Sequence, residues 1–308
     1  MGTPKAAVPP LDALLKAGHE VTAVYTQPDR PSGRGRKVSF SPIKEYSVKH
    51  GLVVEQPKAL RDDEVLKNFI SKRADVTVVV AYGRILPPEF LKASPFGSVN
   101  LHFSLLPKYR GAAPVNWALA NGERLTGVTT MLMDAGLDTG PILLQEIVEI
   151  GNEETAPELT ERLSIVGAEL LVATLEKFEQ IVPKKQSETD ASYAPILRKS
   201  EGLINWSLSA LAISNRVRGF QPFPGSYTFL DGSRMLIWSA RPSSSTIDIT
   251  TQPGTIMRAE GGILEVACGE RTAILIDELQ FEGKRRISAT DALNSGLIKE
   301  GYRFSGET

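Results

Sequence analysis

The sequence has little of what several large classes of protein depend on. A single cysteine, Cys268, excludes an internal disulfide framework and fits a reducing compartment. The longest apolar runs, such as residues 76–82, are far shorter than the roughly 20 residues that a membrane-spanning helix needs. Only three histidines occur, and no cluster of His, Cys and acidic residues has metal-ligand spacing. We therefore expect a soluble protein of the bacterial cytoplasm or of an organelle matrix, with no metal and no membrane partner.

Excess charge and phosphate-binding loops are also missing. The 35 basic and 36 acidic residues nearly cancel, and the formal net charge is −1. Nucleic acid would therefore have to bind through a local patch rather than through the charge of the whole chain. The clearest basic patch comprises Arg30, Arg34, Arg36 and Lys37. Taken alone, such a glycine-containing loop is more often a solvated part of the surface. No Walker-type or dinucleotide-binding glycine loop occurs.

The first half of the sequence alternates short apolar strands with amphipathic helices. The expected strands are residues 21–25, 75–80, 98–102, 126–133 and 142–150, and the expected helices are residues 62–72, 113–120 and 156–181. Such alternation predicts a doubly wound, mainly parallel α/β sheet. In sheets of this kind, ligands bind beyond the carboxyl ends of the strands.

The pattern changes in the second half. Residues 184–204 carry prolines, glycine and polar side chains without periodicity, which predicts a linker. A helix over residues 207–217 follows, with Ser207 as its expected amino-terminal cap. Short strands are then expected at residues 227–230, 235–238, 255–258, 263–267 and 273–279, with Asp231-Gly232 as a hairpin turn. This spacing predicts a small antiparallel barrel. We expect two domains, residues 1–183 and 205–308.

Residues 99–143 hold the side chains best suited to chemistry. Asn100 and His102 are two apart in a strand and therefore project from the same face. A Ser-Leu-Leu-Pro turn and Arg110-Gly111 follow, and Asp138 comes later within a Gly-Leu-Asp-Thr-Gly stretch. An amide, an imidazole and a carboxylate that converge on one cleft can transfer a carbonyl group to an amine. Each of these residues alone is more often structural than catalytic, so the prediction rests on their combination.

This combination resembles the active-site signature of the folate-dependent formyltransferases. Within that superfamily, residues 110–114 and 133–140 are most similar to the methionyl-tRNA formyltransferases. The resemblance continues through residues 26–31, 78–87, 193–195 and 206–209, so it covers nearly the whole chain.

The resemblance implies transfer of a formyl group from 10-formyltetrahydrofolate to the α-amino group of initiator methionyl-tRNA, in support of translation initiation, by a monomer without a metal. It implies that Asn100 and His102 stabilise the oxyanion, while Asp138 orients His102 and accepts a proton through water. The implied folate contacts are Ser104, Leu105, Leu106, Pro107, Tyr82, Gly83 and Ile85. The implied tRNA contacts are Arg30, Arg34, Arg36 and Lys37, together with an OB-fold-like carboxy-terminal barrel. Basic and acidic residues nearly balance over residues 201–308, so bulk charge gives the barrel's role no support.

The sequence departs from the family pattern at its start. Family members usually have a hydrophobic strand before Met-Gly-Thr-Pro, whereas this sequence begins at Met1. The first strand of a doubly wound sheet is normally central, so we expect an in-frame strand segment upstream of Met1. Family members also tend to carry an acidic residue and a phenylalanine where Lys5 and Ala6 stand here, which puts the selection of the methionine side chain in doubt.

Two other functions compete with this interpretation. One is a folate formyltransferase that acts on a small amine or a sugar nucleotide, although such relatives usually lack the Gly-Leu-Asp-Thr-Gly form and the arginine-rich loop. The other is a catalytically inactive RNA-binding homologue. The intact Asn100, His102 and Asp138 argue against the second.

Overall fold

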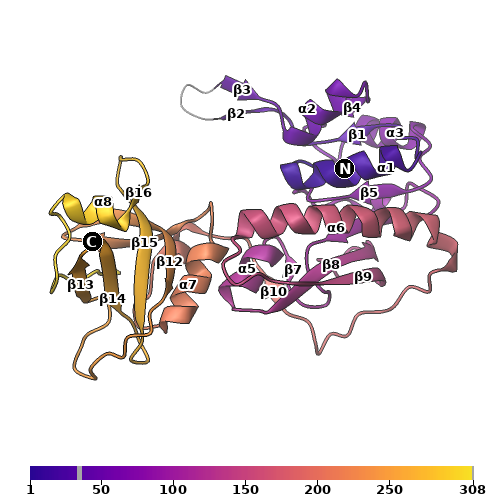
Figure 1. Ribbon diagram of the computed structural model, residues 1–308. Coiled ribbons are helices and arrows are strands. Elements are labelled where there is room, and N and C mark those ends of the chain that lie inside the picture. Colours follow the sequence, from indigo (N-terminus) through magenta and orange to yellow (C-terminus); the bar gives the residue numbers. More distant parts are fainter. Residues whose placement is uncertain (33–36, 307–308) are drawn as a thin grey trace. The chain divides into compact units, whose positions relative to one another are not determined.

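The computed structural model describes residues 1–32 and 37–306 (Figure 1). The chain divides into two compact units. The first unit contains Met1–Pro114, Leu125–Glu149 and Thr160–Pro195. The second contains Val115–Arg124, Ile150–Leu159 and the chain from Ile196 onward. Two short segments that lie between parts of the first unit in the sequence therefore belong to the second unit.

The first unit is built around a mixed sheet. Its strands are β1 (Val24–Tyr25), β4 (Val54–Glu55), β5 (Thr77–Val79), β6 (Ser98–His102), β8 (Leu125–Leu132) and β9 (Ile142–Glu149). The pairs β1–β4 and β5–β6 are parallel, while β8 runs antiparallel to both β6 and β9. The predicted α/β class is confirmed, and the antiparallel pairs lie along the β8–β9 side, where the order is β5-β6-β8-β9.

The first two residues join the parallel pairs to one another. Val80 N donates to Met1 O at 2.9 Å, and Gly2 N donates to Tyr25 O at 3.0 Å. Met1 and Gly2 therefore lie between β1 and β5 and satisfy backbone groups on both strands.

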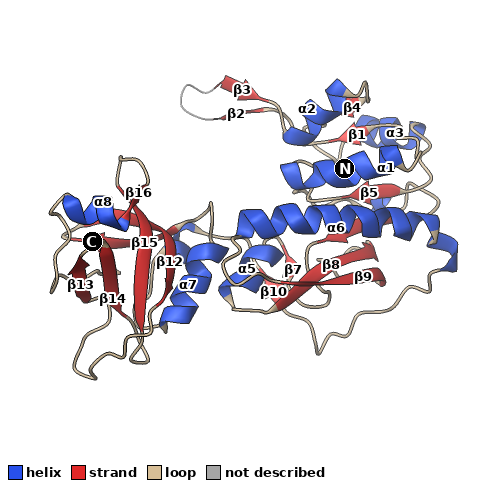
Figure 2. Ribbon diagram, viewed as in Figure 1, coloured by secondary structure: helices blue, strands red, loops and turns tan. Residues whose placement is uncertain are grey.

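Helices cover both faces of this sheet (Figure 2). On one face, Leu14 of α1 (Val8–Lys16) and Leu171 of α6 (Ala156–Glu176) pack in a cluster with Val99 of β6. On the other face, Phe69 of α3 (Asp63–Ser71) and Phe90 of α4 (Pro88–Leu91) pack in a cluster with Val79 of β5. Val78 of β5 packs against the first of these clusters and Val79 belongs to the second. Successive side chains of a strand point to opposite faces of the sheet, so this alternation is expected.

Smaller elements complete the first unit. They are η1 (Lys5–Ala7), α2 (Pro42–Lys49), β7 (Arg110–Gly111), η2 (Phe178–Gln180), β10 (Tyr193–Ala194), and the antiparallel hairpin of β2 (Arg30–Ser32) and β3 (Lys37–Ser39). The basic patch expected in a loop thus begins and ends in paired strands, to which Arg30 and Lys37 belong. Arg34 and Arg36 lie outside the described residues.

The second unit is an antiparallel sheet with two helices packed against its core. The sheet consists of β11 (Ser226–Leu230), β12 (Ser233–Pro242), β13 (Ile256–Glu260), β14 (Ile263–Ala267), β15 (Ala273–Phe281) and β16 (Ile287–Ser288). Its order is β11-β12-β15-β14-β13, with β16 on β15. The remaining elements of this unit are η3 (Lys199–Gly202), α7 (Ala210–Gly219), α8 (Ala289–Asn294) and α5 (Pro114–Ala120), whose first residue still belongs to the first unit.

One segment near the carboxyl end contacts both edges of this sheet. Ser305 bridges Phe229 of β11, and Arg303 bridges Thr255, which directly precedes β13. The predicted hairpin is present, with Asp231 and Gly232 both at positive φ (48° and 74°), as a two-residue turn of type I′ requires.

Two helix boundaries differ from the sequence prediction. The predicted cap Ser207 is wrong: α7 begins at Ala210, and Ser209 Oγ accepts from Ala212 N. The reason is a turn that occupies the preceding residues, in which Ser207 N donates to the Asn205 side chain. The long helix α6 ends at Glu176 rather than at residue 181, and a 3-10 turn follows it.

Candidate active site

Three segments far apart in the sequence meet at the carboxyl end of β6. His102 is the last residue of that strand, and its Nε2 lies 3.3 Å from Asp138 Oδ2. The same carboxylate oxygen accepts a hydrogen bond from Gly111 N at 2.8 Å. Asp138 itself is at φ 54°, in the left-handed region. The structure therefore brings His102, Gly111 and Asp138 together in one nearly buried cluster.

The Asp138 carboxyl is held in its ionised form. Burial alone would raise its pKa, but the hydrogen bond and charge of His102, the Gly111 amide and the charge of Arg110 outweigh burial and hold this pKa below its usual value. At neutral pH the cluster thus contains a carboxylate that can orient an imidazole.

The two ring nitrogens of His102 face different partners. Nδ1 lies 3.0 Å from Ser104 Oγ, which in turn donates to Lys108 O at 2.7 Å. Nε2 faces the Asp138 carboxylate and, at 3.4 Å, the carbonyl oxygen of Gly111. Because neither of these oxygens has a proton to give, Nε2 must carry one. Its N–H bond therefore points toward the region between Asp138 and Gly111.

Asn100 is on the same strand, two residues earlier, and is 8% exposed. Its side-chain amide forms no hydrogen bond with any residue that the structure describes. Neither atom of this amide is among the fully buried unpaired atoms, so both reach the solvent. The Asn100 amide is therefore available to a ligand.

The Ser104–Pro107 turn is fastened to the neighbouring strands by polar side chains. Thr129 Oγ1 donates to Ser104 O at 2.7 Å and accepts from Leu106 N at 3.2 Å. Gln145 Nε2 donates to Leu106 O at 2.9 Å and to Thr129 Oγ1. Leu106 is buried, and Pro107 O accepts from Ser192 N.

Leu105 of the same turn lies against the backbone of β8 at Gly127. A β-carbon at that glycine would stand 2.5 Å from the Leu105 side chain. The turn is thus fixed by hydrogen bonds on one side and by close packing on the other.

The other expected folate contacts differ in what they present. Ile85 is 89% exposed, whereas the Tyr82 side chain is buried in the core between β1, β5 and α3. Gly83 is at φ 73°, and a β-carbon there would lie 2.6 Å from Gln27 Nε2. Gln27 in turn donates to the backbone oxygens of Tyr82 and Gly83. The carbonyl groups of Tyr82 and Gly83 are therefore already paired within the protein, and the Tyr82 side chain is buried.

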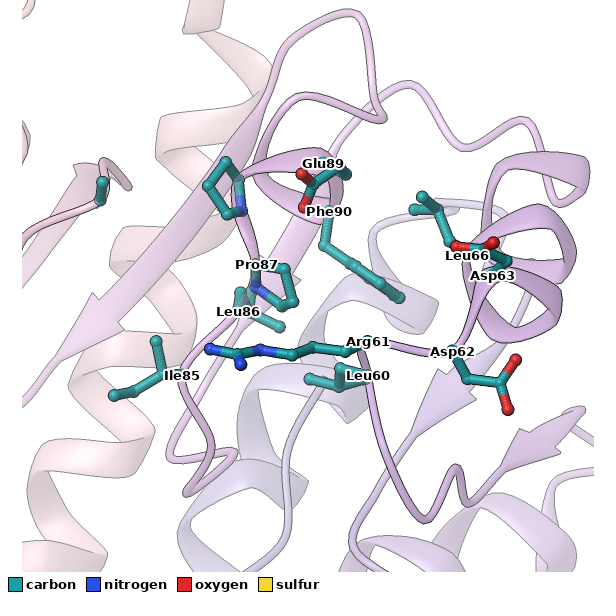
Figure 3. A pocket seen from close by; sticks show the side chains of 12 residues that line it. Leu60, Arg61, Asp62, Asp63, Leu66, Ile85, Leu86, Pro87, Glu89 and Phe90 are labelled. Carbon is teal, nitrogen blue, oxygen red and sulfur yellow. The ribbon is translucent and has the colours of Figure 1, made fainter.

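A pocket of about 540 Å³ opens beside Ile85 (Figure 3). Its lining residues include Leu60, Arg61, Phe90 and Ala135. Ala135 belongs to the turn that carries Asp138. The volume falls within the range of roughly 300–1,000 Å³ that small-molecule sites occupy.

Several supporting residues were not predicted from the sequence. Thr129 and Gln145 lie on β8 and β9, where alternating polar residues are ordinary, and Gln186 lies in the segment predicted to be a linker. No local pattern distinguishes them from surface residues, because each contact depends on a partner distant in the sequence.

The described residues hold neither a metal cluster nor a candidate membrane span. No group of three His, Cys, Asp or Glu side chains within residues 1–32 and 37–306 is placed to hold a metal ion. In the same part of the chain, no helix has the length and apolar character that a membrane span requires.

Comparison with known proteins identifies the family of this chain. Residues 1–175 match the family model described as formyl transferase, and residues 196–296 match the formyl transferase carboxy-terminal domain. A methionyl-tRNA formyltransferase from Solibacter usitatus is 47% identical over 99% of this chain and 97% of its own length. One from Alkaliphilus oremlandii is 45% identical over 98% and 97%.

A solved structure shows the same fold at low identity. The N-formyltransferase from Helicobacter canadensis, in complex with folinic acid and dTDP-3-aminofucose, has a TM-score of 0.65 at 19% identity and covers 89% of this chain and 96% of its own. The full-length similarity at 45–47% identity, with both domains matched, shows that this chain belongs to the methionyl-tRNA formyltransferase family.

Proposed function

We propose that this protein transfers the formyl group of 10-formyltetrahydrofolate to the α-amino group of initiator methionyl-tRNA. The observation that carries the proposal is the cluster of His102, Asp138 and Gly111 beside the unpartnered Asn100 amide. It occurs in a chain similar over nearly its full length to proteins named for this reaction.

The chemistry needs positioning more than strong deprotonation. The amine nitrogen attacks the formyl carbon, the bond from that carbon to N10 of the folate breaks, and N10 gains a proton as the amine loses one. An α-amino group has a pKa of about 8, so part of it is neutral near pH 7. The main barrier is therefore the negative charge that develops on the formyl oxygen.

Asn100 and His102 are assigned to that oxygen. The free amide of Asn100 donates one hydrogen bond, and the Nε2–H of His102 donates the other by replacing its long contact with Gly111 O. Asp138 orients His102 and accepts the amine proton through water. The low pKa of Asp138 keeps it in the basic form that both tasks require.

The folate is assigned to the surface between the Ser104–Pro107 turn and the pocket beside Ile85. The assigned contacts are Ser104, Leu105, Leu106 and Pro107 of the turn, together with Tyr82, Gly83 and Ile85, of which Ile85 lines the pocket. The fit is supported by the apolar lining from Leu60 and Phe90 and by the volume of the pocket.

The tRNA is assigned to two places. Arg30, Arg34, Arg36 and Lys37 of the β2–β3 hairpin contact phosphates, and the antiparallel carboxy-terminal domain, residues 205–308 in this proposal, acts as an OB-like RNA support. The protein acts as a monomer in the bacterial cytoplasm or an organelle matrix. Residues 1–183 form the catalytic part, and residues 184–204 connect the two.

The test is to identify the product. The protein is incubated with 10-formyltetrahydrofolate and methionyl-tRNA, the ester is hydrolysed, and the released amino acid is analysed by mass spectrometry. N-formylmethionine is expected. A parallel reaction with a dTDP-linked amino sugar distinguishes the rival function: formylated sugar without N-formylmethionine would contradict the proposal.

A further inference from the structure

Arg110 and Gln186 form a buried polar network behind the Asp138 turn. Arg110 is fully buried, and its Nε donates to Gln186 Oε1 at 3.0 Å. Its two terminal nitrogens each donate to one oxygen of Glu188 at 3.0 Å. Gln186 is 5% exposed, and its Nε2 donates to Asp138 O at 2.8 Å and Gly140 O at 2.7 Å. The network thus ends on the backbone of the residue whose carboxylate faces His102.

The orientation of the Gln186 amide follows from its neighbours. Arg110 can only donate, so it must meet the amide oxygen. The two backbone carbonyls can only accept, so they must meet the NH₂ group. Both amide hydrogens and the amide oxygen are therefore used, and a flipped amide would place like groups against one another at all three contacts.

Asp138 needs such support because its backbone conformation is unfavourable. It is a non-glycine residue at φ 54°, a region that costs free energy unless the surroundings impose it. Two residues later, the chain passes so close to β8 that a β-carbon at Gly140 would lie 1.7 Å from Leu132 O. Gln186 joins two carbonyls of this turn, those of Asp138 and Gly140. In the turn held this way, the Asp138 carboxylate contacts Gly111 N and His102.

We infer that Gln186 is a positioning residue for the reaction. Held by Arg110, it fixes the backbone of Asp138 so that the carboxylate orients His102. This inference rests on the proposed role of Asp138. It also gives a function to residues 186–194 of the segment between the two matched domains, where the Ser192 and Ala194 carbonyls accept from Arg110 N and Ala112 N.

The informative substitution is Gln186→Glu. A glutamate keeps the size of the side chain and the partner of Arg110, but it loses both donors and places an oxygen against the carbonyls of Asp138 and Gly140. We expect kcat to fall about 10- to 100-fold, the loss typical of a catalytic group displaced by about 1 Å. The KM values for folate and tRNA should change less than about threefold, because Gln186 contacts neither of the binding surfaces proposed here.

A double-mutant cycle with Asp138→Asn tests whether Gln186 acts through Asp138. If it does, adding Gln186→Glu to the Asp138→Asn enzyme should lower kcat less than about threefold further. Gln186→Met, which removes the polar contacts without adding charge, should repeat the result if Gln186→Glu fails to fold. The matched control is Gln221→Glu, because Gln221 Nε2 also donates to two carbonyls, those of Val217 and Trp238, in the second unit. Any effect of the control on kcat should be the same with and without Asp138→Asn.

Three outcomes would overturn the inference. They are an unchanged kcat in the Gln186 variants, a rise in KM at constant kcat, and an equal loss of kcat with and without Asp138→Asn. If Asp138→Asn alone keeps full activity, the proposed role of Asp138 fails as well. Loss of activity in Asp138→Asn with an unaffected Gln186→Glu refutes the inference only.

Discussion

His102 has a polar protein partner at each of its ring nitrogens, whereas the side-chain amide of Asn100 has none among the described residues. The imidazole contacts Ser104 through Nδ1 and Asp138 through Nε2, while the Asn100 amide has no partner among the residues that the structure describes. An oriented donor beside an unused one is what a developing oxyanion requires. The two residues should therefore respond differently to substitution.

Asn100→Ala should reduce kcat by roughly 10² to 10³ with almost no change in the free energy of unfolding, because it breaks no protein hydrogen bond. Asn116→Ala offers the opposite control. Asn116 Nδ2 donates to Gly219 O in the second unit, so this variant should lose stability and keep its turnover. Steady-state kinetics and urea unfolding measure the two quantities. Equal turnover in Asn100→Ala and wild type would remove Asn100 from the site.

His102→Ala and Asp138→Asn should each lower kcat by a similar factor of roughly 10² to 10³. The first removes a donor, and the second removes the charge that orients it. Circular dichroism establishes whether each variant is folded. Near-normal turnover in either folded variant would show that its residue has no catalytic role.

At the residue scale, the sequence motif named the catalytic candidates but not their supports. Asn100, His102 and Asp138 stand out because their types and order are uncommon together. Gln186 and Thr129 do not, because a buried glutamine or threonine is recognised only by the carbonyl that it contacts, and those carbonyls lie 25 or more positions away in the sequence. The spacing of a motif shows which residues are close in the sequence, but not which distant residues become close in the folded protein.

At the element scale, strands were predicted better than caps. β6 (Ser98–His102) and β14 (Ile263–Ala267) have the predicted bounds, and nearly every residue of both strands is buried. The cap of α7 was predicted two residues too early, because Ser207 and Ser209 are both suitable caps and only the Asn205 turn selects between them. Capping choices of this kind depend on the path of the preceding chain.

The β2–β3 hairpin leads to a prediction about tRNA. Replacing Arg34, Arg36 and Lys37 together by glutamine should weaken tRNA binding. The slope of log K for tRNA against log salt concentration should decrease in magnitude by roughly one for each phosphate that the protein no longer neutralises. Folate affinity should not change. The matched control neutralises three exposed lysines elsewhere, Lys49, Lys67 and Lys92. A hairpin variant with the same salt slope as wild type would show that this patch does not contact tRNA.

Gly127 of β8 allows both β9 and the Ser104–Pro107 turn to approach β8 closely. A β-carbon there would lie 2.1 Å from Glu146 O and 2.5 Å from Leu105, so β9 or the turn must move. Gly127→Ala should cost about 1–3 kcal/mol of unfolding free energy, as overpacking does, and raise the KM for folate. Gly306→Ala, where the nearest atom is 3.9 Å away, is the control. Unchanged stability and KM in Gly127→Ala would contradict this account of the turn.

At the scale of the whole molecule, the two compact units follow the two matched domains only in part. Segments 115–124 and 150–159 belong to the second unit although they lie within the first matched domain, residues 1–175. Arg218 of α7, for example, donates to Gly151 O and Glu154 O. A prediction that divides the sequence at one linker cannot assign these two segments to the second unit, because their composition does not differ from that of the neighbouring segments.

The measurement that tests the central claim most directly is donor consumption as a function of the acceptor. The full-length protein is mixed with 10-formyltetrahydrofolate, and tetrahydrofolate release is followed with initiator methionyl-tRNA, with elongator methionyl-tRNA, with a dTDP-linked amino sugar and with no acceptor. We predict release only with methionyl-tRNA, with a higher kcat/KM for the initiator form. Efficient release with the amino sugar and none with methionyl-tRNA would contradict the account.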